Sequence, residues 1–134
     1  MIRILVVDDA QLVRKRLCLI LAEHPEFQVV AEASSASEAI EKAKQYQPDV
    51  VLLDIAMREL NGLHATPLLK RVASQTEILI VTQYHNRFFV REAFAAGARG
   101  FLRKSDAGAE LVTAVTDVFS KKTFISKSLQ PLSA

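Results

Sequence analysis

Two short apolar runs, each followed by aspartate, constrain the fold of this chain more than any other feature. Ile4–Val7 leads into Asp8 and Asp9. Val50–Leu53 leads into Asp54. Continuous apolar runs of this length are typical of strands buried on both faces, and such strands belong to parallel sheets covered by helices. Because ligands of these sheets bind beyond the carboxyl ends of the strands, the three carboxylates are expected at a functional site.

Short apolar runs and helical patterns alternate along the rest of the chain. Its 134 residues, half of them hydrophobic, suffice for one domain with a substantial core. We expect strands at Ile2–Val7, Gln28–Ala33, Asp49–Leu53, Ile78–Thr82 and Gly100–Leu102. We expect helices at Gln11–Glu23, Ser37–Gln45, Thr66–Ala73, Arg87–Ala96 and Ala109–Phe119. This alternation predicts an α/β fold, a flavodoxin-like doubly wound five-stranded parallel sheet of order 2-1-3-4-5 with five helices on both faces.

Local signals support two of the helix boundaries. Thr66 and Pro67 are interpreted as an N-cap followed by proline at the first helical position. Gly97 is placed to end the fourth helix as a C-cap glycine.

The predicted strand order brings five polar groups to one edge of the sheet. The first and third strands lie side by side, so their aspartates meet there, together with Thr82 from the fourth strand and Lys104 just after the fifth. Clustered carboxylates repel one another unless a cation neutralises them, and hard oxygen ligands suit Mg²⁺. A metal, a lysine and a hydroxyl together complement a phosphoryl group. An aspartate carboxylate can itself attack phosphorus, and Asp54 is the most central candidate.

Four motifs, ILVVDD, VLLDIAMRELNG, VTQ and GARGFLRK, are similar to those of receiver (CheY-like) domains of bacterial two-component response regulators. The resemblance extends to about residue 122, so residues 1–122 are predicted to form the receiver domain. It implies that Asp54 is the phosphoacceptor and that Asp8, Asp9 and the backbone carbonyl of Ala56 help to hold Mg²⁺. It also implies a sensor histidine kinase as phosphodonor. Such a domain is not an enzyme in the usual sense, since it catalyses only its own phosphotransfer and dephosphorylation.

The same resemblance implies a conformational switch. Lys104 is expected to pair with the phosphoryl oxygens, and Thr82 to turn toward the phosphoryl group. Phe101 is expected to change rotamer with Thr82. The added charge would thereby bias the surface formed by the fourth helix, the fifth strand and the fifth helix.

Two positions depart from the side chains that this family uses to hold the attacking water. They match Ala56 and Tyr84, neither of which is acidic or an amide. We therefore predict slow autodephosphorylation.

Adjacent phenylalanines suggest a partner surface on the fourth helix. Neighbours on a helix point about 100° apart, so Phe88 and Phe89 cannot both face the sheet. If Phe89 and Val90 pack inward, Phe88 is left partly exposed, and with Tyr84 it forms a candidate contact for a partner or a second protomer. The alternative is that Phe88 packs along its own helix.

Residues 123–134 are similar to the linker that follows the receiver in transcription factors of the NarL/FixJ (LuxR) type. In that family a helix-turn-helix domain comes next. Two interpretations stay open: a receiver taken from a longer regulator, or a stand-alone receiver that acts through protein contacts and as a possible homodimer. DNA binding is expected only through such an output domain, because the sequence shows neither a recognition helix nor a concentrated basic face.

Composition and motif details exclude other classes. The net charge of +2 is modest, and Cys18 is alone, which suits a reducing compartment. With no leader pattern and no run of membrane-spanning length, we expect a cytoplasmic protein without membrane contact. A haloacid-dehalogenase-type phosphatase would need an acid where Ala56 stands, and a dinucleotide-binding domain would need a glycine-rich turn after the first strand. A phosphorylation-independent docking module stays open.

Overall fold

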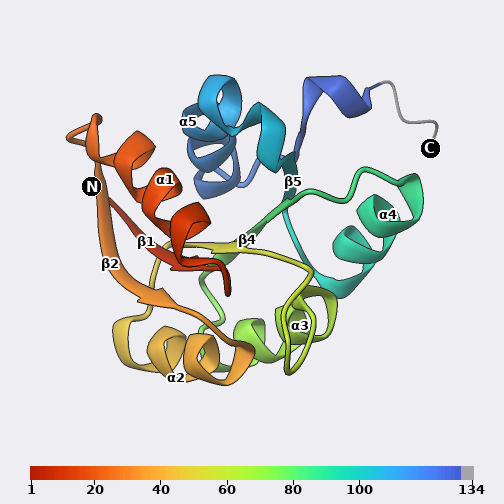
Figure 1. The fold of residues 1–134 in the computed structure, drawn as a ribbon. Coiled ribbons are helices and arrows are strands. Elements are labelled where there is room, and N and C mark those ends of the chain that lie inside the picture. The colour runs from red at the N-terminus through yellow and green to blue at the C-terminus, as the bar shows by residue number, and fades with distance from the viewer. Residues whose placement is uncertain (131–134) are drawn as a thin grey trace.

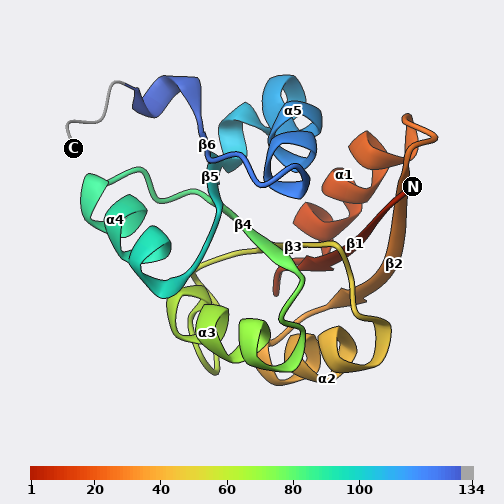
Figure 2. The ribbon, with the colours of Figure 1, turned by 180° about the vertical axis from the view of Figure 1, so that it is seen from behind.

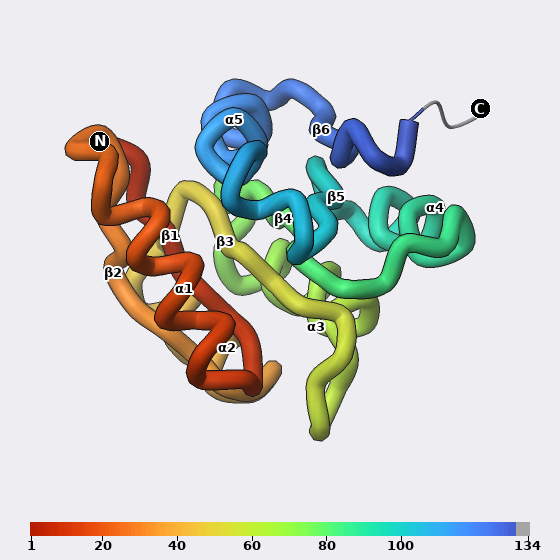
Figure 3. Tube along the Cα trace, turned by 45° about the horizontal axis from the view of Figure 1, so that its top comes forward, coloured from red at the N-terminus to blue at the C-terminus, as the bar shows by residue number. Residues whose placement is uncertain are grey.

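A parallel sheet forms the middle layer of the structure, a computed structural model that describes residues 1–130 (Figure 1). Its order is β2-β1-β3-β4-β5-β6, and Figure 3 shows the strands following one another in this order across the molecule. The strands are β1 (Ile2–Val7), β2 (Phe27–Ala33), β3 (Val50–Leu53), β4 (Glu77–Thr82), β5 (Gly100–Arg103) and β6 (Phe124–Ile125). The predicted flavodoxin-like α/β fold is confirmed, with one strand more than expected.

Helices cover both faces of the sheet (Figures 1 and 2). They are α1 (Gln11–Ala22), α2 (Ala36–Tyr46), α3 (Gly62–Val72), α4 (Arg87–Ala96) and α5 (Ala107–Phe119), with short 3₁₀ turns at Lys104–Asp106 and Lys127–Leu129. One core lies between the sheet and α1 and α5, and the other between the sheet and α2, α3 and α4. Successive side chains of a strand point to opposite faces, so Leu52 joins the first core and Leu53 the second. Within residues 1–130, no helix is long and apolar enough to cross a membrane.

The start of α3 differs most from the prediction. Asn61, not Thr66, is the N-cap, and its side chain accepts a hydrogen bond from the backbone N–H of His64 at 3.0 Å. Pro67 lies inside the helix instead of at its first position. The Thr66 hydroxyl donates to the carbonyl of Gly62 at 2.7 Å, one turn earlier. Proline lacks a backbone N–H and is therefore favoured in the first turn of a helix, which is why Pro67 suggested a start at Thr66. The side chain of Asn61 provides the actual N-cap, and the helix begins four residues earlier.

Other predicted boundaries agree within one or two residues. Gly97 ends α4 in a left-handed conformation with φ of 112°, as predicted for a C-cap glycine.

The sixth strand was not predicted. Residues 123–130 belong to the segment interpreted as a linker, but Phe124 and Ile125 pair in parallel with Gly100 and Phe101 of β5. A two-residue strand leaves no periodicity that a sequence could show. The last part of that predicted linker, residues 131–134, lies outside the described residues.

A buried carboxylate forms ion pairs at the amino ends of the strands, which is the edge of the sheet opposite the predicted site. Glu77, only 3% exposed at the start of β4, lies 2.6 Å from the Lys121 ammonium, 3.2 Å from the Arg99 guanidinium and 3.9 Å from the Lys70 ammonium. Burial alone would raise the pKa of Glu77, but hydrogen bonds from Lys121 and Arg99 outweigh it and lower the pKa. These contacts join β4 to the turn before β5 and to the turn after α5.

Candidate functional site

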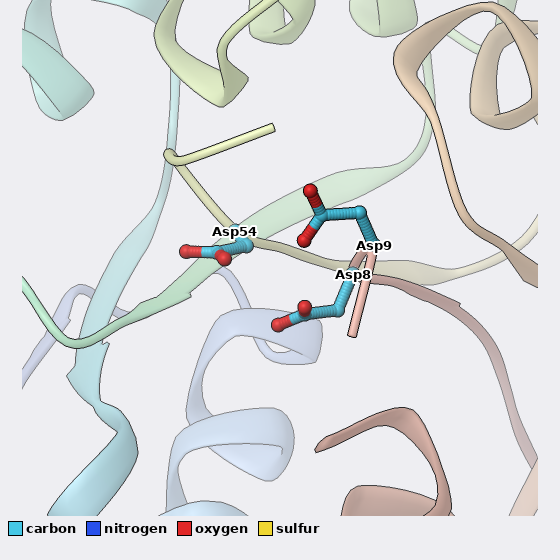
Figure 4. A group of neighbouring side chains, drawn as sticks. All are labelled: Asp8, Asp9 and Asp54. Carbon is cyan, nitrogen blue, oxygen red and sulfur yellow. The ribbon is translucent and has the colours of Figure 1, made fainter. Parts of the chain in front are cut away.

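The ends of β1 and β3 place three carboxylates together, as predicted. Figure 4 shows Asp8 and Asp9 extending from the end of β1 and Asp54 from the end of β3. One oxygen of each carboxylate lies within 4.8 Å of the others. Asp8 and Asp54 are buried, whereas Asp9 is half-buried. The adjacency follows from the sheet, since the backbone N–H of Asp54 donates to the carbonyl of Val7 at 3.2 Å.

Lys104 supplies the positive charge at this edge. Its ammonium nitrogen lies 2.9 Å from Asp8 Oδ2 and 2.9 Å from Asp54 Oδ2. Burial disfavours the charged ammonium, but hydrogen bonds to Asp8 and Asp54 outweigh that effect and raise the pKa of Lys104. The lysine therefore stays protonated and bridges the two strands.

The surroundings of Asp54 disfavour its ionised form. Its burial raises its pKa, the hydrogen bond from Lys104 opposes that rise, and the charge of Asp8 adds to it. The result is a raised pKa, because desolvation and like charge together exceed the help from Lys104. An additional cation would relieve both unfavourable effects.

The donor set fits a hard divalent cation. Asp54 Oδ1 is buried and has no hydrogen-bond partner among the described residues. Three carboxylates that converge on one space are the oxygen ligands that Mg²⁺ prefers, and a half-buried Asp9 leaves room for the waters that Mg²⁺ usually keeps. Ala56 lines the adjoining cavity, and the role of its carbonyl as a ligand stays a prediction.

A cavity of about 490 Å³ opens beside the acids. Its lining consists of Asp9, Ile55, Ala56, Met57, Arg58, Asn61, Tyr84 and Phe89. The rings of Tyr84 and Phe89 stack with centroids 4.7 Å apart and form one wall. Arg58 is exposed and reaches Asp9 only at 3.8 Å, so it lies at the rim.

The two predicted switch residues both lie in the interior. Thr82 is fully buried at the end of β4, where its hydroxyl accepts a hydrogen bond from the backbone N–H of Tyr84 at 3.4 Å and acts on Asp54 by lowering its pKa. Phe101 is fully buried in the core under α2, α3 and α4. The structure thus holds Phe101 in the inward position.

Phe88 lies on the surface of α4 with 58% of its area exposed, while Val90 is buried and Phe89 is half-buried. The rings of Phe88 and Phe89 pack edge to face, with their centroids 5.6 Å apart. Its role in partner contact stays a prediction.

Two residues that support the site were not identified from the sequence. Gly62 donates its N–H to the carbonyl of Ile55 at 2.9 Å, and a Cβ there would overlap the backbone carbonyl oxygen of Asp54. Arg14 donates to the carbonyl of Asp8 at 2.6 Å and so fixes the end of β1. The Asn-Gly pair at the start of α3 was a usable signal for Gly62, whereas nothing in the sequence distinguished Arg14 from other surface arginines.

A doubly wound parallel sheet with acids, a lysine and a hydroxyl at its carboxyl edge is the arrangement of a domain of the receiver class. The family model for the response regulator receiver domain matches residues 4–116, and the chain belongs to this family. The prediction made from the four motifs is thereby confirmed.

Proteins with similar sequences include a response regulator and a transcriptional regulatory protein. The chain is 39% identical over 129 residues to the response regulator GacA of Pseudomonas viridiflava, covering 96% of this chain and 60% of that protein. It is 37% identical over 120 residues to the transcriptional regulatory protein LnrK of Bacillus subtilis, covering 90% and 54%. The chain thus spans little more than half the length of these relatives.

Solved structures of response regulators superpose closely on this chain. A LuxR-family two-component response regulator from Aurantimonas sp. superposes with a TM-score of 0.92 at 32% identity, covering 96% of this chain and 92% of that one. The receiver domain of the putative response regulator NarL from Mycobacterium tuberculosis gives 0.84 at 31% identity, covering 89% and 96%. The predicted NarL/FixJ (LuxR-type) subfamily is confirmed.

Proposed function

We propose that Asp54 is the phosphoacceptor of this receiver and takes its phosphoryl group, in a Mg²⁺-dependent reaction, from a phosphorylated histidine of a sensor kinase. The observation that carries the proposal is the position of Asp54. It is buried beside two further carboxylates, one of its oxygens contacts Lys104, and the other has no hydrogen-bond partner within residues 1–130. Asp8, Asp9 and Asp54 would hold the metal.

The chemistry is an in-line phosphoryl transfer. A carboxylate oxygen of Asp54 forms a bond to phosphorus, the phosphorus–nitrogen bond of the donor breaks, and the imidazole leaves with the electron pair and then takes a proton. Bound Mg²⁺ supplies charge neutralisation for the phosphoryl oxygens. Lys104 stays protonated, because its pKa is raised, and would pair with one of those oxygens. The Thr82 hydroxyl, which is buried at the end of β4, would donate to another.

Loss of the phosphoryl group is expected to be slow without a partner. The two side chains that match the family's water-orienting positions are Ala56 and Tyr84, which line the cavity and carry no carboxylate or amide. Decay of the phosphorylated domain over minutes or longer would agree with this expectation, whereas decay within seconds would contradict it.

We further propose that the output is transcriptional control through a DNA-binding domain, because the similar proteins include a transcriptional regulatory protein of which this chain covers 54%. Phosphorylation would act on the surface of α4, β5 and α5. Exposed Phe88 on α4 is the proposed contact for a partner or a second copy of the chain.

The test uses acetyl phosphate as the donor. Intact-mass spectrometry should show one added phosphoryl group in the presence of Mg²⁺, and none with excess EDTA or in Asp54→Asn. Asp117→Asn on α5 is the matched control and should be modified like the wild type. If saturating donor leaves the wild type unmodified, the phosphoacceptor proposal is wrong and a docking role is favoured.

A further inference from the structure

After α5 the chain returns along the edge of the sheet. Residues 124–129, here called the edge segment, form β6 and the 3₁₀ turn that follows. Figures 1 and 2 show this segment beside β5, between α5 and α4. The family match ends at residue 116, so the edge segment lies outside the part shared through that model.

The apolar side of the edge segment contacts the core that holds the switch phenylalanine. Ile125 stands opposite Phe101 in the parallel register, and paired residues on neighbouring strands point to the same face. Ile125 and Leu129 both pack against the core cluster that contains Phe101. A Phe101 ring that left the core toward the sheet edge would therefore meet Ile125.

The polar side of the edge segment is tied to the backbone around Lys104. Ser126 is fully buried, its N–H donates to the carbonyl of Phe101 at 3.0 Å, and its hydroxyl accepts from the N–H of Arg103 at 2.8 Å. Beyond Lys104, the hydroxyl of Ser128 donates to Asp106 at 2.6 Å. The segment is thus bonded immediately before and shortly after the lysine that contacts Asp54.

We propose that the edge segment is a latch that is closed when Phe101 is inward and that is strengthened when Asp54 is phosphorylated. This inference rests on the proposed function. A phosphoryl group on Asp54 would draw Thr82 toward it and keep Lys104, which is already 2.9 Å from Asp54, at the site. Both effects would favour the inward Phe101 and hold the β5 backbone to which Ser126 is hydrogen-bonded. Coupling between two sites is reciprocal, so the closed latch must in turn favour the phosphorylated state.

The latch is tested with the full chain, Mg²⁺ and beryllium fluoride as the phosphoryl mimic, by amide hydrogen exchange. Peptides over residues 54–62 report binding at the site, and peptides over residues 122–130 report the latch. We expect slower exchange in both. Slower exchange at residues 54–62 with no change at 122–130 overturns the latch and leaves the proposed function standing. No change in either overturns the proposed function and the latch with it.

Variants give an independent readout of the coupling. Ser126→Ala should weaken the apparent affinity for beryllium fluoride by at least about fivefold, the lower end of typical allosteric coupling. Thr123→Ala, an exposed neighbour, is the matched control and should bind like the wild type. A merely structural role for Ser126 would lower the melting temperature and leave the affinity for the mimic unchanged, and that result would refute the latch. If Ser126→Ala does not fold, the wild-type exchange measurement decides alone.

Discussion

Replacing the proposed phosphoacceptor by asparagine is predicted to stabilise the metal-free protein. The pKa of Asp54 is raised, so its ionised form is less favourable in the folded than in the unfolded chain. Asp54→Asn keeps the shape of the side chain and removes the charge. Lys104 keeps Asp8 as an ion-pair partner at 2.9 Å in the variant.

The magnitude follows from three opposing contributions. With an effective dielectric constant of about 20, Asp8 and Asp54 at the 4.8 Å limit repel by about 3.5 kcal/mol, while Lys104 at 2.9 Å attracts Asp54 by about 6 kcal/mol. The difference favours ionisation by about 2 kcal/mol, but burial of the carboxylate costs several kcal/mol. The sum leaves ionised Asp54 destabilising by about 1 kcal/mol, which predicts a rise in melting temperature of roughly 4 °C for Asp54→Asn.

Urea and thermal unfolding in EDTA and in Mg²⁺ would test this prediction. In EDTA the variant should exceed the wild type, and the difference should shrink as the pH falls through the raised folded pKa of Asp54, because the wild type then becomes neutral as well. In Mg²⁺ the order should reverse, since metal at a hundredfold its Kd adds about 2.7 kcal/mol to the wild type alone. Asp117→Asn serves as the control. A variant less stable than the wild type in EDTA would refute the reasoning, because the Lys104 contact would then dominate.

Three further perturbations follow from the structure. Glu77→Gln should lower the free energy of unfolding by about 2 kcal/mol, with Glu41→Gln near zero as control. Since the folded pKa of Glu77 is lowered, the loss should be full above the ordinary glutamate pKa and vanish as the pH falls through the folded one; a pH-independent loss in urea titrations would contradict this. Gly62→Ala should displace the Asp54 backbone and reduce the rate of phosphorylation by acetyl phosphate at least about tenfold, and an unchanged rate would show that the loop yields freely. Lys104→Met should tighten Mg²⁺ binding in calorimetry, because the carboxylates lose their competing cation, and weaker binding would show that the lysine orders the site instead.

The sequence was sufficient to predict a structural feature where several residues pointed to the same one. The aspartates that follow two buried strands were predicted to lie close together, because the strand order of a doubly wound sheet brings those strand ends side by side. It failed at the start of α3, because Thr66 and Pro67 suggested that the helix begins there, whereas Asn61 is the N-cap. It also missed β6, since two residues carry no pattern, and the contacts of Ser126 depend on tertiary packing. The distances within the site come only from the structure, which shows that the Lys104 ammonium lies 2.9 Å from both Asp8 and Asp54.

The central claim is that the phosphoryl group resides on Asp54, and it can be located directly. Borohydride reduces an aspartyl phosphate to homoserine, so the phosphorylated and reduced protein can be digested and its peptides sequenced by mass spectrometry. We predict homoserine at position 54 only, formed with acetyl phosphate and Mg²⁺ and absent when either is omitted. Homoserine at position 8 or 9, or none at any aspartate of a protein that carries the added mass, would contradict it.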